Sequence, residues 1–166
     1  MKKLFLLIGC CLIFLVFTTS KTHALSCAVP QVDDKVIEGA LIIFEGVMKS
    51  SRGLSSFEKL KFTVADLNQM GGALKDLKVY TFSVTKAWKD AKQGEDVQVL
   101  RNTYWGRGFL EEAKYLVVSS EKYGELYFSH LCEPTFYLQN PKQPWMKRSM
   151  DNLRKYFAEQ KVGVDK

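Results

Sequence analysis

The sequence predicts a mainly β fold, a small antiparallel barrel with one short helix before it and an amphipathic helix after it. Five segments rich in Val, Ile, Phe and Tyr recur at regular spacing, with turn signals between them. This spacing favours a barrel of short strands over alternating helices and strands. Helical patterns flank the region on both sides.

The first elements are a helix and a bent strand. Residues 31–40 carry two acids near their start and a glycine near their end, which is typical of a short helix. Residues 40–50 are rich in Ile, Val and Phe and predict a strand, in which Gly46 indicates a bulge or a sharp bend. Ser51–Asp76 gives mixed signals, and we expect a long excursion that contains a strand or a helical turn.

Four further strands follow in the sequence. Residues 77–88 give the clearest one, because Tyr80, Phe82 and Val84 share one face while Thr and Ser residues share the other. The remaining strands are predicted at residues 97–104, 114–121 and 125–132.

A C-terminal extension, residues 141–166, follows the barrel, which we assign to residues 25–140. Prolines mark an extended stretch after the last strand. A set of apolar residues then recurs at helical spacing and predicts an amphipathic helix packed on or near the barrel. Its members are Met146, Met150, Leu153 and Phe157.

Residues 1–24 are typical of a secretory signal peptide. A basic head precedes a short apolar run, and Ala24 provides the small residue before the cut. The run is shorter than the roughly 20 residues that a membrane helix needs. Cleavage after Ala24 makes Leu25 the mature N-terminus and predicts a secreted or extracytoplasmic protein. Lipidation at Cys10 or Cys27 is the weaker alternative, because neither flanking sequence fits a lipoprotein motif well.

Charge and residue chemistry limit the function classes. The whole chain has a formal net charge of +6, but residues 1–24 hold three lysines and no acid, so the mature chain has only +3. No basic stripe with interleaved aromatics points to nucleic acid as a partner. His130 is the one histidine of the mature chain, and its strand parity with Phe128 favours a hydrogen-bonded, partly buried imidazole over a catalytic base. We therefore predict no enzyme activity, no metal site and no cofactor.

Six segments carry a family resemblance: LSCAVP, IIFEGVMKS, VYTFSVTKAWK, EDVQVL, GFLEEAKYLVV and ELYFSHLC. In this order they resemble the netrin-like domain family, which includes tissue inhibitors of metalloproteinases and their bacterial relatives. The resemblance spans most of the mature chain, is weakest over Ser51–Asp76 and ends near Pro141. It implies a five-stranded OB-type Greek-key barrel with flanking helices, in agreement with the strand count above.

Cleavage leaves two cysteines, and an even pair in an exported protein predicts one disulfide, with two free buried thiols as the alternative. In the family, two N-terminal cysteines bond to two sites in the barrel. Leu25 and Trp105 stand where one of those bridges would be, and Cys27 and Cys132 stand where the other would be. The resemblance therefore implies a Cys27–Cys132 disulfide that pins the N-terminal segment to the barrel.

In the inhibitor members of the family, the N-terminal amine and carbonyl chelate a protease zinc, and the next side chain enters the specificity pocket. By position, Leu25 and Ser26 would take these roles, although the missing bridge leaves them held only through Cys27 and lowers affinity through ordering entropy. The implied edge for a partner or a zinc protease comprises Leu25, Ser26, Cys27, Ala28, Arg101, Asn102, Thr103, Tyr104 and Trp105.

We therefore expect an exported, non-enzymatic interaction module that binds a protein partner through the N-terminal edge and the Ser51–Asp76 excursion. A zinc metalloproteinase is one candidate partner, which would make the chain an inhibitor. A polyanion or oligosaccharide binder is the remaining alternative, in which aromatic side chains would form a stacking platform. Core packing is favoured for these aromatics, which are Tyr80, Phe82, Tyr127 and Phe128.

Zinc chelation by the mature N-terminus predicts that one extra residue before Leu25 abolishes inhibition, because the chelating amine is then displaced from the metal. The measurement is an inhibition titration of the correctly processed protein and of the extended protein against a panel of secreted zinc proteases. Equal inhibition by the two forms would contradict chelation. The absence of inhibition by either form would remove the inhibitor alternative.

Overall fold

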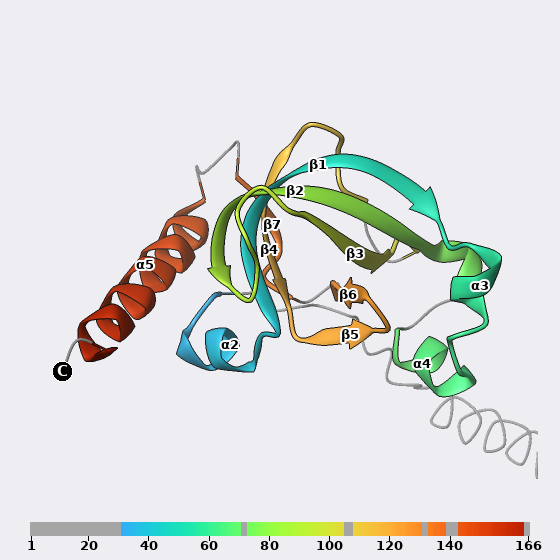
Figure 1. The fold of residues 1–166 in the computed structure, drawn as a ribbon, viewed down its shortest axis with the longest axis horizontal. Helices are drawn as coiled ribbons and strands as arrows, with labels where there is room; N and C mark the ends of the chain where they lie inside the picture. The colour runs from blue at the N-terminus through green and yellow to red at the C-terminus, as the bar shows by residue number, and fades with distance from the viewer. Residues whose placement is uncertain (1–30, 71–72, 105–107, 131–132, 139–142, 165–166) are drawn as a thin grey trace, which may run out of the picture.

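The computed structural model describes residues 31–70, 73–104, 108–130, 133–138 and 143–164. These ranges form a sheet with α2 and α5 toward one side and α3 and α4 toward the other (Figure 1). The elements are α2 (Asp34–Gly39), β1 (Ile42–Gly53), α3 (Ser56–Lys59), α4 (Val64–Gln69), η1 (Leu74–Asp76), β2 (Leu77–Lys89), β3 (Asp96–Asn102), β4 (Lys114–Ser119), β5 (Glu121–Tyr123), β6 (Leu126–Phe128), β7 (Phe136–Tyr137) and α5 (Pro144–Val164).

The described strands make one seven-stranded sheet in the order β5-β6-β3-β2-β1-β4-β7. Neighbouring strands are antiparallel except for β3 and β6, which are parallel. The mainly β fold with a C-terminal helix is confirmed, but the prediction of purely antiparallel strands is wrong for this pair. The two strands are parallel because the chain passes from β3 to β6 by a crossover through β4 and β5 instead of a hairpin.

The observed strands differ from the predicted ones in several places. Strand β1 runs on to Gly53, beyond the predicted end at residue 50, and β6 covers only Leu126–Phe128 of the strand predicted at residues 125–132. The strand predicted at residues 114–121 is divided at Ser120 into β4 and β5, and β7 (Phe136–Tyr137) was not predicted. The excursion Ser51–Asp76 contains the end of β1, two short helices and a 3₁₀ turn, in line with the expected mixture of strand and helical turn. Helix α2 forms where a short N-terminal helix was predicted, and its N-cap is Asp33.

The bend predicted at Gly46 is confirmed. The register between β1 and β2 shifts between Glu45 and Gly46, as it does at a β-bulge. A Cβ at Gly46 would lie 2.9 Å from a ring carbon of Phe44 and 3.0 Å from the carbonyl oxygen of Ser83. Only glycine allows the backbone of β1 to come this close to β2.

Within the described residues, three apolar clusters hold the sheet and its helices together. The largest draws on β1 to β4 and contains the predicted face of Tyr80, Phe82 and Val84, each buried. A second cluster joins β1 and β4 to α2 and α5. A third places residues of the excursion, among them Leu54 and Met70, against β2, β3 and β6. Burial of this apolar area is the main favourable contribution to folding.

Helix α5 packs its apolar face on the sheet, as its helical spacing predicts. Leu153 is fully buried, the Trp145 ring packs edge-on against Phe136 at 5.1 Å, and Phe157 lies 5.8 Å from Trp88 of β2. The helix is thus part of the same folded unit as the strands. In the described part of the chain, no helix has both the length and the apolar character needed to cross a membrane.

Truncation of Leu153 tests whether α5 stabilises the domain. Leu153→Ala should lower the free energy of unfolding by about 3 kcal/mol, because it removes a fully buried side chain between helix and sheet. Chemical denaturation of the mature protein measures this difference. The control is Lys155→Ala on the same helix, where the side chain is 75% exposed. Equal, small effects of the two substitutions would contradict the packing.

Candidate functional site

The edge predicted from the sequence lies only partly within the described residues. Outside them are Leu25, Ser26, Cys27, Ala28, Trp105 and Cys132. The Cys27–Cys132 disulfide and zinc chelation by the N-terminus therefore stay predictions that rest on the resemblance.

The described part of that edge, Arg101–Tyr104, lies at the end of β3 and holds the returning excursion. The side-chain amide of Asn102 donates to the Met70 carbonyl at 2.9 Å. The backbone amide and the hydroxyl of Thr103 both donate to the Asp76 carbonyl, at 2.8 and 2.9 Å. These two residues position the excursion on the sheet, a role that the sequence did not suggest for them.

The neighbouring residues Arg101 and Tyr104 differ in exposure. The guanidinium of Arg101 lies 4.8 Å from the centre of the Phe109 ring and donates a long hydrogen bond of 3.4 Å to the Ser129 hydroxyl. Burial lowers the pKa of Arg101. Tyr104, by contrast, is 64% exposed. Of this stretch, Tyr104 is therefore the residue best placed to touch a partner.

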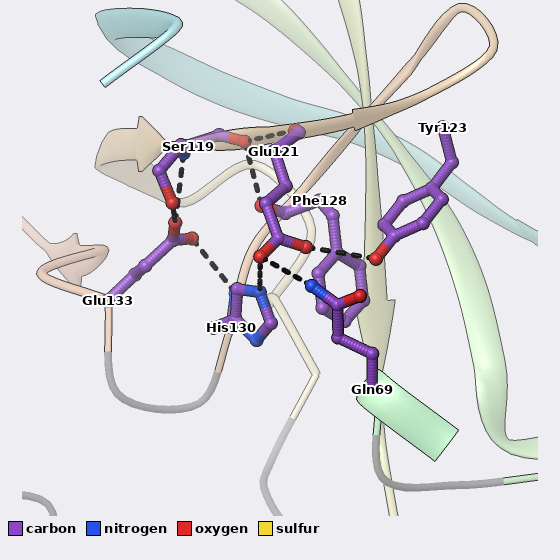
Figure 2. A network of polar contacts seen from close by, with 8 residues as sticks. Gln69, Ser119, Glu121, Tyr123, Phe128, His130 and Glu133 are labelled. Carbon is purple, nitrogen blue, oxygen red and sulfur yellow. Dashed lines mark hydrogen bonds and ion pairs between the residues drawn. The ribbon is translucent and has the colours of Figure 1, made fainter. Parts of the chain in front are cut away.

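A polar network centred on Glu121 surrounds His130 (Figure 2). The His130 Nε2 atom lies 3.0 Å from Glu121 Oε1, and the Gln69 amide of α4 donates to the same oxygen at 3.0 Å. The Tyr123 hydroxyl donates to Glu121 Oε2 at 2.9 Å. Burial opposes ionisation of Glu121, but the hydrogen bonds from Tyr123, His130 and Gln69 outweigh it and lower the pKa of this carboxyl.

Glu133 closes the other side of the same network. Its carboxylate accepts hydrogen bonds from the amide and the hydroxyl of Ser120, at 2.9 and 2.6 Å, and from the His130 amide at 2.9 Å. Burial raises the pKa of Glu133 in spite of these donors. Ser119 is fully buried, and its hydroxyl contacts the carbonyl oxygens of Glu121 and Phe128 at 2.8 and 2.7 Å.

The network links α4, β5 and the segment after β6, and within the described ranges no serine hydroxyl of the network is hydrogen-bonded to the His130 side chain. The imidazole is held by Glu121 and packs edge-on against Phe128 at 4.4 Å, as expected for a partly buried structural histidine. The nearby Ser119 hydroxyl is directed to backbone carbonyls. Among the described residues, no group of three or more His, Cys, Asp or Glu side chains could hold a metal ion. Sequence reasoning identified His130 but not its partners Glu121 and Glu133, which the β5–β6 hairpin and the turn after β6 bring to it.

A cleft of about 450 Å³ opens between α3 and the turn that joins β5 to β6. We call it the first cleft; it is lined by Ser55, Phe57, Glu58, Lys61, Phe62, Gln98, Lys122, Tyr123, Gly124, Glu125 and Leu126. Figure 1 shows α3 and the β5–β6 hairpin on the same side of the molecule. Gly124 forms the turn with a φ of +61°, a conformation that favours glycine.

Exposed apolar side chains recur along the excursion, and one of them, Phe57, lines the first cleft. Phe57 is 68% exposed, Leu60 84% and Val64 75%. We call these three residues the excursion patch. Large apolar side chains that share one exposed segment are a mark of interaction surfaces, whereas scattered single ones are ordinary.

Two capping boxes fix the helices that carry the patch. The Ser55 hydroxyl accepts from the Glu58 amide while the Glu58 carboxylate accepts from the Ser55 amide, and Thr63 and Asp66 repeat the arrangement at α4. Arg52 binds Glu58 through two contacts of 2.6 and 2.7 Å. The sequence does contain the signal, a Ser or Thr followed three residues later by an acid. It would have located both helices.

Comparison with known proteins adds no family to this description. No family model matches the chain, and no curated protein matches it significantly. The netrin-like resemblance therefore remains a prediction.

The Arg52–Glu58 pair makes the free energy of unfolding depend on pH. The hydrogen bonds from Arg52 lower the pKa of Glu58 from 4.5 to about 2. A carboxyl with a lowered pKa stabilises the fold fully above its unfolded pKa, and this contribution disappears as the pH falls through about 2. Glu58→Gln should therefore cost about 1 kcal/mol near pH 7, a modest value because Arg52 is 43% exposed.

Thermal unfolding of both proteins between pH 7 and pH 2 measures this difference, which should shrink toward zero at the acid end. The matched control is Asp151→Asn, in the pair with Arg154 on α5, where both side chains are more than half exposed. It should change stability by at most a few tenths of a kcal/mol, roughly. A constant Glu58→Gln effect down to pH 2 would contradict the ion pair.

Proposed function

We propose that this chain is an exported, non-enzymatic interaction module that binds a protein partner through the excursion patch and the first cleft. The observation that carries the proposal is the exposure of Phe57, Leu60 and Val64 on one short segment beside an open cleft. A partner would bury these side chains and gain the free energy of removing them from water.

The anchoring of the excursion supports this proposal. Leu54 and Met70 bury their side chains against the sheet, and the Gln69–Glu121 and Asn102–Met70 hydrogen bonds fasten α4 and the chain after it. These contacts therefore hold the excursion patch in a fixed position on the sheet. A surface held in its binding conformation loses less entropy on association than a free loop does.

We further propose that the sheet is an OB-type barrel of the netrin-like kind. The end strand β5 follows β4 after the single residue Ser120, so β4 and β5 together would act as one bent strand. That strand pairs with β1 through β4 and with β6 through β5. Counted in this way, the five strands would complete a ring, and the parallel β3–β6 pair fits the same topology.

Site-specific crosslinking tests the binding function. A photoreactive residue at Leu60 should crosslink a protein from the culture fluid, whereas the same residue at the exposed Arg148 of α5 should not. The crosslinked protein is then purified, and its affinity is measured by titration. Equal crosslinking from both positions would contradict the assignment of the surface.

With that purified partner, the double variant Phe57→Ser, Leu60→Ser should bind at least about tenfold more weakly, because it removes apolar contact area at the patch. Its fold should be unchanged, since both side chains are mostly exposed. The matched control is Leu110→Ser, a substitution of another apolar side chain that is 64% exposed. Equal affinities of the double variant and the control would overturn the proposal.

A further inference from the structure

We propose that the partner segment is an extended peptide in which basic residues adjoin an apolar residue. This inference rests on the proposed function and names the chemistry of the partner. The apolar residue would occupy the first cleft, and the basic residues would occupy a second cleft that continues from it.

The second cleft, of about 490 Å³, lies beside the first. Its lining residues are Ile42, Thr81, Asp90, Glu95, Asp96, Val97, Gln98, Lys122, Glu125 and Tyr127. Gln98, Lys122 and Glu125 line both clefts, so the two adjoin over β3 and the β5–β6 turn, and we treat them together as one groove. An extended chain could follow such a groove, whereas a single small ligand would fill only one part of it.

The second cleft is acidic although the chain as a whole is basic. Four carboxylates line it against one ammonium group, while the full chain has a formal net charge of +6. The ammonium, Lys122, lies 3.4 Å from the Glu125 carboxylate and 4.9 Å from the centre of the Tyr127 ring. The remaining carboxylates thus have no cation of the lining to neutralise them, and their field favours a positively charged ligand.

Asp90 and Asp96 are the carboxylates most available to such a ligand. Glu95 accepts a hydrogen bond from the Lys92 amide at 2.7 Å and so serves the turn before β3. Asp90 and Asp96 are exposed, and within the described ranges neither takes part in a salt bridge. A Lys or Arg side chain of a partner could therefore pair with them without breaking a contact of this chain.

Two other ligand classes fit the groove less well. A polyanion would meet the carboxylates of the second cleft and be repelled. An oligosaccharide would need open aromatic faces, but Lys61 lies over the Phe57 ring at 4.7 Å and Lys122 over the Tyr127 ring at 4.9 Å. The first cleft does offer apolar surface from Phe62, Tyr123 and Leu126, which suits an aliphatic or aromatic side chain.

Three fluorescein-labelled peptides of equal length test the chemistry by fluorescence anisotropy on the mature protein. The first is Phe-Leu-Gly-Arg-Lys-Arg, the second replaces its basic residues by Glu-Asp-Glu, and the third replaces Phe-Leu by Gly-Ser. The first peptide should bind at least about tenfold more tightly than either of the others at low ionic strength, and added salt should reduce this advantage over the acidic peptide. Equal binding of all three, or no binding of the first at millimolar protein, would overturn the inference.

The double variant Asp90→Asn, Asp96→Asn locates the binding in the second cleft. It should weaken binding of the first peptide by about tenfold, since it removes two negative charges that line the second cleft. Asn tolerates the positive φ of +49° at Asp90, so the variant should fold. The matched control, Glu38→Gln with Glu111→Gln, removes the same charge outside the groove and should leave the affinity unchanged. Equal weakening by both variants would overturn the location.

Binding of the partner that is crosslinked through position 60 distinguishes a failure of this inference from a failure of the proposed function. Loss of that partner with Phe57→Ser, Leu60→Ser but not with Asp90→Asn, Asp96→Asn would keep the interaction surface and overturn the basic peptide. Loss with both variants supports both statements. Retention with both would overturn both.

Discussion

The close approach of β1 to β2 at Gly46 is the constraint on which the arrangement of the molecule depends. A Cβ there would lie 2.9 Å from the Phe44 ring and 3.0 Å from the Ser83 carbonyl oxygen, so the strand can bend only because the residue is glycine. Before the bend, β1 is packed with α2 and α5. After it, β1 continues to Arg52, whose guanidinium binds the first turn of α3. One strand thereby connects the helical side of the sheet to the candidate binding side.

The polar network around Glu121 joins elements of the candidate binding side. The groups that contact the Glu121 carboxylate come from α4, from β5 and from the segment after β6, and they are the side chains of Gln69, Tyr123 and His130. A partly buried carboxylate is tolerated because donors compensate for its desolvation. Glu121, which the histidine singled out by the sequence contacts, also accepts a hydrogen bond from Gln69 of α4, so the network fastens the excursion to the sheet.

The sequence predicted features that are decided locally. Alternation along β2 placed Tyr80, Phe82 and Val84 on one buried face, and Gly46 marked a bend, because each depends on a few neighbouring residues. The parallel β3–β6 pair and the hydrogen bond from Gln69 to Glu121 could not be predicted, since both join segments that lie far apart in the sequence. The first cleft depends on both local and long-range features. Its helix caps had a readable local signal, but the β5–β6 turn that faces them is brought there by the tertiary fold.

The placement of Arg52 also fixes the helix that carries Phe57. Its guanidinium makes two short contacts to the Glu58 carboxylate, at 2.6 and 2.7 Å, and it donates to the Gln98 side chain of β3 at 3.3 Å. Gln98 lines both clefts. The ion pair at the start of α3 therefore does two things: it stabilises the helix that carries Phe57, and it connects that helix to a residue that the two clefts share.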